Sequence, residues 1–188
     1  MNADLGERLA RVEAQLAIQQ LAARYARGVD SRNIDALVEI FSPNADFGEH
    51  GKGEQGVRGF FGSGPSLRAF YRSLHQICGH VIELIDADHA RGTVYCRAEH
   101  EDGDAWVVQL MVYFDQYERI NERWVFAGRR PGWLHTGDMR KTPQEVRFND
   151  WPGRDSSHFG PQVPQGYRTW EAFWEQYPEE RIRRTDLP

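Results

Sequence analysis

Asp30 is the first residue of the chain whose position suggests chemistry, because it closes a run of helical periodicity that ends YARGVD. The C-terminal end of a helix carries partial negative charge, so a carboxylate there is unfavourable by about 0.3–1 kcal/mol. Asp30 could instead cap a following helix, for which Ser31 and Asn33 are also candidates. The chemical alternative is that Asp30 accepts a hydrogen bond from an imidazole, whose second nitrogen is then free to act as a base.

Three histidines lie where they could meet that carboxylate or bind a substrate. His75 is expected near the end of a helix over residues 66–78, facing a cavity between helices and sheet; the alternative is a solvent-exposed histidine that the helix dipole favours. His80 is expected to open the first strand of a sheet and His100 to end the second, where both could be ordinary strand-end residues. His75 and His80 are the candidate partners of Asp30. A zinc site made of the three histidines lacks a recognised ligand spacing, so we expect no bound metal.

Other common catalytic patterns are absent from the sequence. It has no Gly-x-Ser-x-Gly elbow, no Cys–His signature and no dinucleotide-binding fingerprint. The glycine-rich stretch over residues 49–65 lacks the Lys-Ser/Thr ending and the context of a phosphate-binding loop, and is predicted to be a mobile loop. Cys78 and Cys96 have no paired spacing and are predicted to be buried free thiols. Proton transfer without a cofactor is the chemistry that remains.

The elements that must position these residues follow from hydrophobic periodicity. Helical spacing over residues 5–29 and again over residues 34–41 predicts a helical hairpin. After the helix expected over residues 66–78, the period changes to two. An antiparallel meander is predicted there, with turn signals near residues 86–88, 102–103 and 121–122.

Two features of the predicted meander and its continuation point to further packing. The strand expected over residues 105–120 is apolar on both faces, which predicts helices on one face and another surface, such as a second subunit, on the other. Residues 139–188 are polar and rich in Pro and Gly but keep many aromatics, unlike a disordered tail. We expect this extension to dock on the domain of residues 1–138 or on a neighbouring subunit.

Composition narrows the classes of partner. The chain has 188 residues, enough for one compact domain, and its net charge is −5 without a dense Lys/Arg stripe. That balance argues against nucleic acid and against an anionic membrane surface. No apolar run approaches the ~20 residues needed to span a bilayer, and the N-terminus lacks a signal-peptide pattern. We therefore expect a cytoplasmic protein that binds a small molecule.

Taken in order, three stretches of the chain resemble the SnoaL-like branch of the nuclear transport factor 2-like superfamily. They read LAIQQLAARYARGVDSRNIDALVEIFSPNADF, then HQICGHVIELIDADHARGTVYC, then DQYERINERWVFAGRR, and the resemblance covers about residues 5–136. The resemblance implies an α+β fold in which a curved antiparallel sheet is closed into a cone-shaped barrel by N-terminal helices. It also implies a homotrimer.

Members with this pattern include scytalone dehydratase, bile-acid dehydratase and hexachlorocyclohexane dehydrochlorinase, which use a His–Asp dyad for proton abstraction and elimination. The resemblance places Asp30 at the carboxylate of that dyad and His75 at its base. Tyr25 matches a tyrosine of the dehydratases, five residues before the aspartate, and Arg129 matches a basic position that lines the pocket. Gly79 departs from the pattern, since relatives often carry asparagine there.

The residues and the resemblance together predict a cofactor-independent lyase, first of all a dehydratase, that acts on an apolar aromatic or polycyclic small molecule. The predicted catalytic residues are His75, Asp30, Tyr25 and Arg129, and the predicted substrate-binding residues are Tyr71, His80, His100 and Phe47. Formaldehyde loss from an aromatic diol, isomerisation and cyclisation would use the same base and stay open. A non-catalytic binding or protein-interaction module is the rival from another class, and the small subunit of a ring-hydroxylating oxygenase is a third.

Overall fold

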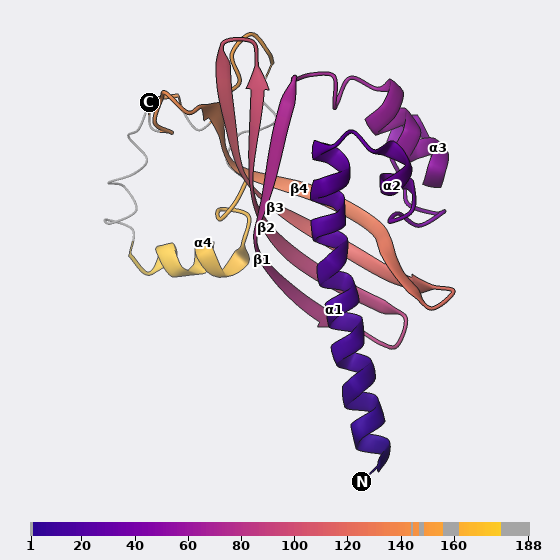
Figure 1. Cartoon of the computed structure of the whole chain (residues 1–188). Helices are drawn as coiled ribbons and strands as arrows, with labels where there is room; N and C mark the ends of the chain where they lie inside the picture. The colour runs from indigo at the N-terminus through magenta and orange to yellow at the C-terminus, as the bar shows by residue number, and fades with distance from the viewer. Residues whose placement is uncertain (1, 144, 147–148, 156–161, 178–188) are drawn as a thin grey trace.

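The computed structural model describes residues 2–143, 145–146, 149–155 and 162–177 of the chain. A long helix comes first, then short helical segments, then a sheet, and last a short helix (Figure 1). The helical segments are α1 (Asn2–Asp30), α2 (Ile34–Val38), the 3-10 turn η1 (Gly48–His50), α3 (Gly53–Val57), the π-helical turn η2 (Arg58–Ser63) and α4 (Arg168–Glu175). The strands are β1 (Arg72–Leu84), β2 (His89–Asp102), β3 (Ala105–Ile120), β4 (Arg123–Asp138) and β5 (Asn149–Asp150).

The sheet is a curved, open meander in the order β1-β2-β3-β4-β5. The first four strands pair antiparallel, and β5 pairs with β4 in parallel over two residues. All three predicted turns are present. Asn121 and Glu122 both have positive φ, 48° and 64°, as a two-residue type I′ hairpin turn requires.

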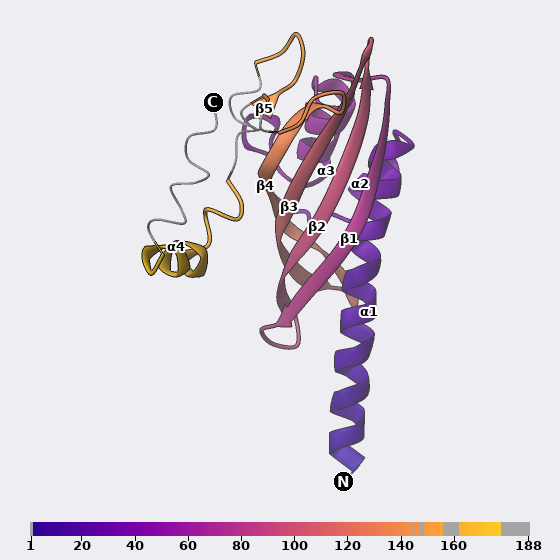
Figure 2. The same ribbon diagram turned by 90° about the vertical axis from the view of Figure 1, so that its left-hand side faces the viewer.

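One face of the sheet is covered by α1. Figure 2 shows this helix lying along the sheet, with α4 on the opposite side. The side of α1 that faces the sheet is apolar, and its members are buried in the core: Ile18, Leu21, Ala22, Tyr25 and Val29. They meet side chains that point inward from β2, β3 and β4, including Val94, Met111 and Phe126. The predicted α+β architecture, with helices covering a curved antiparallel sheet, is confirmed.

The helix predicted over residues 66–78 is wrong. Leu67 is buried and Phe70 partly buried, as predicted for an apolar face, but residues 72–84 form β1. From Arg72 to Ile77 this strand pairs in register with β2, and its side chains alternate between exposed and half-buried. Backbone pairing with β2 therefore overrides a local pattern that happens to fit a helix.

Two smaller predictions in the same region are also wrong. The glycine-rich stretch is not a loop throughout, because it contains α3 and η2. Its glycines permit close packing: a Cβ on Gly53, whose φ is 53°, would lie 2.5 Å from the carbonyl oxygen of Pro43. Of the two cysteines, Cys96 is buried as predicted, whereas Cys78 is exposed.

The outer face of the sheet is partly covered by the C-terminal part of the same chain. The backbone N–H of Val163 donates to the carbonyl of Trp133 at 3.1 Å, and the ring of Tyr167 lies 6.2 Å from that of Phe114. On β3 itself, Val108 and Val112 are 5% and 4% exposed. Much of the outer face of β3 is thus buried within one chain, and this reduces the surface that a second subunit would have to cover.

Candidate active site

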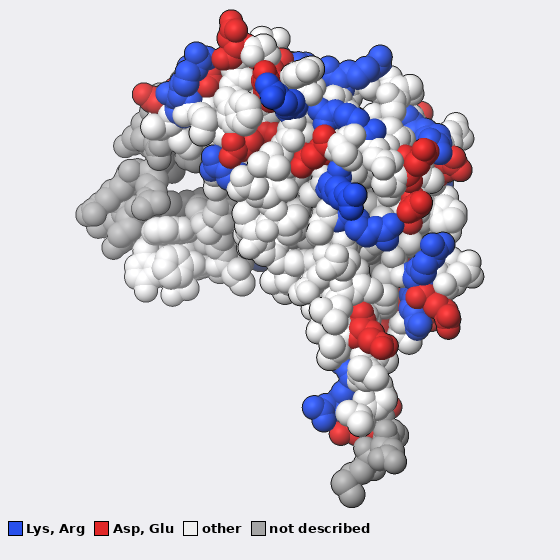
Figure 3. Space-filling view, in the orientation of Figure 1, with Lys and Arg blue, Asp and Glu red and all other residues white. Residues whose placement is uncertain are grey.

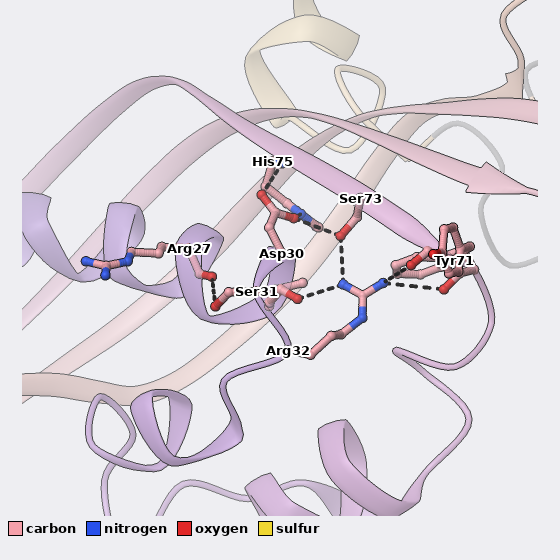
Figure 4. A network of polar contacts seen from close by, with 9 residues as sticks. Arg27, Asp30, Ser31, Arg32, Tyr71, Ser73 and His75 are labelled. Atoms are coloured by element: carbon pink, nitrogen blue, oxygen red, sulfur yellow. Dashed lines mark hydrogen bonds and ion pairs between the residues drawn. The ribbon is translucent and has the colours of Figure 1, made fainter.

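The carboxylate of Asp30 and the ring of His75 are in direct contact where α1 meets β1. His75 Nδ1 lies 2.7 Å from Asp30 Oδ1, and the backbone N–H of His75 donates to Oδ2 at 2.8 Å (Figure 4). The hydroxyl of Ser73 donates to Oδ1 at 2.8 Å. Ser73 and His75 are two residues apart on one strand, so both side chains point to the same face and reach the same carboxylate.

These hydrogen bonds explain why an aspartate can end α1. Burial alone would raise the pKa of Asp30, but the hydrogen bonds from His75 and Ser73 and the charge of the imidazole outweigh it, so this pKa lies below its ordinary value. The capping role falls to Asn33, whose side chain accepts a hydrogen bond from the N–H of Ala36 at 3.0 Å. Asp30 therefore does not cap α2.

Arg32 supports the same corner, and sequence reasoning missed it. The residue has φ of 57°, which turns the chain sharply after α1. Its guanidinium donates to the carbonyl of Val29 at 2.7 Å and to the hydroxyl of Ser73 at 3.0 Å, and it lies 5.0 Å from the centre of the Phe70 ring. Ser73 thus accepts from Arg32 and donates to Asp30. If residues 72–84 had been recognised as a strand, the spacing Ser-x-His would have placed Ser73 beside His75 on the face that meets Asp30.

His75 lines a cavity of about 740 Å³ between α1, the segment that precedes β1, and the inner face of the sheet. Most of the lining is apolar or aromatic, and polar groups are few. The aromatic members are Tyr25, Phe60, Phe61, Phe70, Tyr113, Trp133 and Trp151; the imidazole, amide and guanidinium groups belong to His50, His75, His100, Gln109 and Arg154. A large apolar cavity with few polar groups is typical of a small-molecule site.

His100 lines this cavity next to His75. The two rings lie 5.6 Å apart at 89°, and His100 also packs against Phe70 at 4.4 Å and Trp151 at 5.2 Å. Burial, with the neighbouring charge of His75, lowers the pKa of His100 to about 3. This imidazole is therefore neutral at physiological pH and offers a hydrogen bond without a charge.

Tyr25 also lines the cavity, whereas Arg129 lies behind it. The Arg129 guanidinium lies 4.3 Å from the centre of the Tyr25 ring and 4.2 Å from that of Tyr113. It makes two hydrogen bonds to Asp115, at 2.8 and 2.7 Å, in an ion pair whose side chains are 4% and 0% exposed. Burial raises the pKa of Tyr25, although the positive charge of Arg129 opposes that shift.

Asp115 is a second residue that sequence reasoning missed. It occupies an inward position of β3, two residues after Tyr113, where an acid among apolar neighbours needs a partner. Besides the two hydrogen bonds from Arg129, the carboxylate of Asp115 accepts one from the hydroxyl of Tyr117 at 2.7 Å. The inward alternation of an acid on an otherwise apolar strand was the signal that could have revealed the pair.

The remaining predicted substrate-binding residues lie elsewhere. Tyr71 is 77% exposed and outside the cavity, because it precedes a strand and is not on the inner face of a helix. His80 is also outside it; its Nε2 lies 3.0 Å from the hydroxyl of Tyr117, and burial lowers its pKa. Phe47 lines a neighbouring cavity of about 300 Å³, which Arg129 also lines. Tyr71 and His80 thus do not line the main cavity, and Phe47 is adjacent to it.

Within residues 2–143, 145–146, 149–155 and 162–177, no group of three His, Cys, Asp or Glu side chains is arranged to hold a metal ion. Among the helices that the structure describes, none is long and apolar enough to cross a membrane.

Residues 10–130 match the model of the SnoaL-like domain, and the chain belongs to this family. A search of proteins with curated functions finds no sequence match. Similar folds occur among solved structures. The hexachlorocyclohexane dehydrochlorinase LinA-type3 from Novosphingobium barchaimii LL02 is 21% identical, with a TM-score of 0.65 over 72% of this chain and 96% of that chain.

Two proteins from Novosphingobium aromaticivorans are similar in the same way. One, provisionally assigned as a scytalone dehydratase, is 15% identical, with a TM-score of 0.60 over 71% of this chain and 92% of that chain. The other, a protein like nuclear transport factor 2 with a cystatin-like fold, is 19% identical, with a TM-score of 0.60 over 70% of this chain and 89% of that chain. At these identities the likeness concerns the fold.

Proposed function

We propose that this SnoaL-like protein is a cofactor-independent lyase in which His75, oriented by Asp30, removes a proton from an apolar aromatic or polycyclic small molecule. The observation that carries the proposal is the 2.7 Å contact between His75 Nδ1 and Asp30 Oδ1 at the wall of a 740 Å³ cavity. The presence of a dehydrochlorinase among proteins of similar fold supports an elimination.

In the proposed reaction the two nitrogens of His75 have different tasks. When Nδ1–H donates to Asp30, Nε2 carries the lone pair that accepts the substrate proton. The imidazolium that forms is stabilised by a carboxylate whose pKa is already low, so Asp30 stays ionised during the reaction.

Tyr25 is suited to assist the leaving group. Burial raises the pKa of its phenol, so the hydroxyl stays protonated at neutral pH and can donate to a departing oxygen. In a dehydration, the C–H proton moves to His75, the electron pair forms a C=C bond, and the C–O bond breaks. The leaving oxygen takes a proton from Tyr25, which regains it from His75, so water is the second product.

Arg129 acts on this chemistry through Tyr25. Its charge is compensated by Asp115, and its guanidinium lies against the Tyr25 ring, so it favours a transient phenolate rather than contacting the substrate. Formaldehyde loss, isomerisation or cyclisation would use the same base, and the substrate decides among them.

The test is turnover of hydroxylated polycyclic compounds whose dehydration extends a conjugated system, followed by ultraviolet absorbance. Asp30→Asn is expected to lower kcat by about 10²–10⁴-fold, and His75→Gln by at least as much. The double variant should lose little more than the worse single variant, because the two residues act as a unit.

The chain offers a matched control for the same chemical change. Asp86 also contacts an imidazole, with 3.0 Å between its carboxylate and His89 Nδ1, but both side chains are more than half exposed. Asp86→Asn should leave turnover unchanged. If the native protein binds these compounds without turning them over, a non-catalytic binding module is favoured. Full activity of Asp30→Asn would contradict the catalytic role of Asp30 and His75.

A further inference from the structure

The N-terminal half of α1 projects beyond the sheet and carries an apolar stripe on its outer side. Figures 1 and 2 both show this part of the helix extending past the ends of the strands. Its large apolar side chains are unusually exposed: Leu5 is 64% exposed, Leu9 56%, Val12 51% and Leu16 57%. Figure 3 shows uncharged atoms on this part of the molecule between acidic and basic side chains.

The stripe faces away from the protein's own sheet. At 3.6 residues per turn, Leu5, Leu9, Val12 and Leu16 fall on one line along the helix, and Ala14 falls about half a turn away. Ala14 packs against the core, as do Ile18 and Leu21 farther along that side. Neither a bend nor a small rotation of α1 can therefore bury the stripe against the sheet, so it needs another surface.

The spacing of the stripe is that of a coiled-coil seam. The steps from Leu5 to Leu16 are four, three and four residues, which places Leu5 and Val12 at d positions and Leu9 and Leu16 at a positions of a heptad. The seam ends at Gln19, near the point where α1 begins to bury its opposite side in the core. Two consecutive parts of one helix thus serve two different surfaces.

Charged residues beside the seam favour pairing with the α1 helix of a second copy of this chain in the parallel orientation. In this register Arg8 occupies a g position and Glu13 the following e position, five residues later. Parallel coiled coils bring g of one chain next to the following e of its partner, so Arg8 would meet Glu13 of the second copy twice in a symmetric pair. An antiparallel pair would instead oppose like charges. The helix also needs support, because a projecting segment of this length that contains Gly6 is marginally stable alone in water.

We propose that the α1 segment of residues 5–16 forms a parallel coiled coil with the same segment of a second copy of this chain. The contact is separate from the cavity and does not depend on the proposed reaction. Its expected product is an assembly in which two α1 helices lie side by side with residue 5 of one chain facing residue 5 of the other.

Disulfide trapping in the full chain tests this contact directly. Leu5→Cys is introduced together with Cys78→Ser, which removes the exposed native thiol and leaves Cys96 buried. Under mild oxidation, the proposed seam predicts cross-linking on the order of a hundredfold faster than for Arg11→Cys in the same background, because helix pairing raises the effective thiol concentration. Arg11 lies on the same segment but off the seam. Equal rates for the two variants would overturn the proposal.

Charge exchange tests the orientation with the same readout. Arg8→Glu should slow trapping through Leu5→Cys by on the order of tenfold, because it replaces two attractive pairs by repulsive ones. Adding Glu13→Arg should restore the rate, since the pairs are then reversed rather than lost. Arg11→Glu makes the same change of charge off the seam and should have no effect. Failure of the double exchange to restore trapping, with circular dichroism showing a folded protein, would exclude the parallel register.

Discussion

Asp30 accepts three hydrogen bonds, and this determines how its removal affects stability. Because its folded-state pKa lies below the ordinary value, the carboxylate contributes stability that is present above its unfolded-state pKa and is lost as the pH falls through the folded-state pKa. We expect Asp30→Asn to lower Tm by about 2–4 °C at pH 7, with the difference narrowing as the pH falls below ~4. Thermal melts of the native protein and of Asp30→Asn, recorded from about pH 3 to about pH 8, measure this difference in Tm. A difference in Tm that does not change with pH would show that the charge of Asp30 does not contribute to the stability of the folded protein.

The buried pair of Asp115 and Arg129 makes a different prediction. Removing one partner of a buried ion pair leaves an uncompensated charge, at a cost of about 3–5 kcal/mol, so Asp115→Asn should lower Tm by about 10 °C. Asp115→Asn combined with Arg129→Met should recover part of the loss, because no charge is then left without its partner. The exposed pair of Glu83 and Arg91 supplies the control: Glu83→Gln should shift Tm by less than about 3 °C. If Asp115→Asn melts like Glu83→Gln, the pair is not as buried as its geometry indicates.

At the scale of elements, the C-terminal segment builds one wall of the cavity. The indole N–H of Trp151 donates to Asp102 at 2.6 Å, and the guanidinium of Arg154 contacts the same carboxylate at 2.7 Å. Trp151 is 5% exposed and packs against His100. Trp151 and Arg154 lie outside residues 10–130, the part of the chain that matches the family model.

We therefore expect Asp102→Asn to loosen this wall without touching the His75–Asp30 pair. KM should rise by about 3–10-fold with a smaller change in kcat, because a bound substrate is held less well while the base is unaffected. Asp104→Asn, an exposed residue in the same turn, is the matched control. A fall in kcat with unchanged KM would place the effect in the chemical step instead.

The sequence predicted those elements whose pattern and tertiary role agree. Residues 5–29 and the turns of the meander were predictable because apolar spacing and turn residues point to one structure. Residues 66–78 were not, since Leu67 and Phe70 fit a helical stripe while pairing with β2 decides the outcome. The contact between Asp30 and His75 was nevertheless anticipated through the family resemblance, although the helix on which His75 was placed is a strand. Arg32 and Asp115 act through partners 41 and 14 residues away, so the local signals at these positions do not by themselves identify those partners.

At the scale of the whole molecule, the apolar surface is divided between two faces. Besides the stripe on α1, the outer face of the sheet exposes four large apolar side chains: Leu74 at 53%, Val81 at 66%, Tyr95 at 47% and Trp106 at 38%. The predicted trimer would have to use this patch, because Val108 and Val112 of β3 are already buried within the chain. We retain the trimer as a proposal that rests on the patch.

The two surfaces point in opposite directions, and this makes their use distinguishable. A ring of three chains closed through the outer sheet faces would carry its α1 stripes on the outside, so pairing of α1 would join one ring to another rather than close the same ring. We therefore expect light scattering to give the mass of three chains at low micromolar concentration, and this mass should rise with protein concentration as rings join.

Two substitutions separate the two contacts. Val81→Glu should abolish the trimer yet leave disulfide trapping through α1 intact, whereas Leu9→Glu should abolish the concentration-dependent rise in mass and leave the trimer. Ile85, which is 60% exposed at the turn after β1, provides the control Ile85→Glu, with no expected effect on either. A mass of two chains that is insensitive to Val81→Glu would exclude the trimer and leave α1 pairing as the whole assembly.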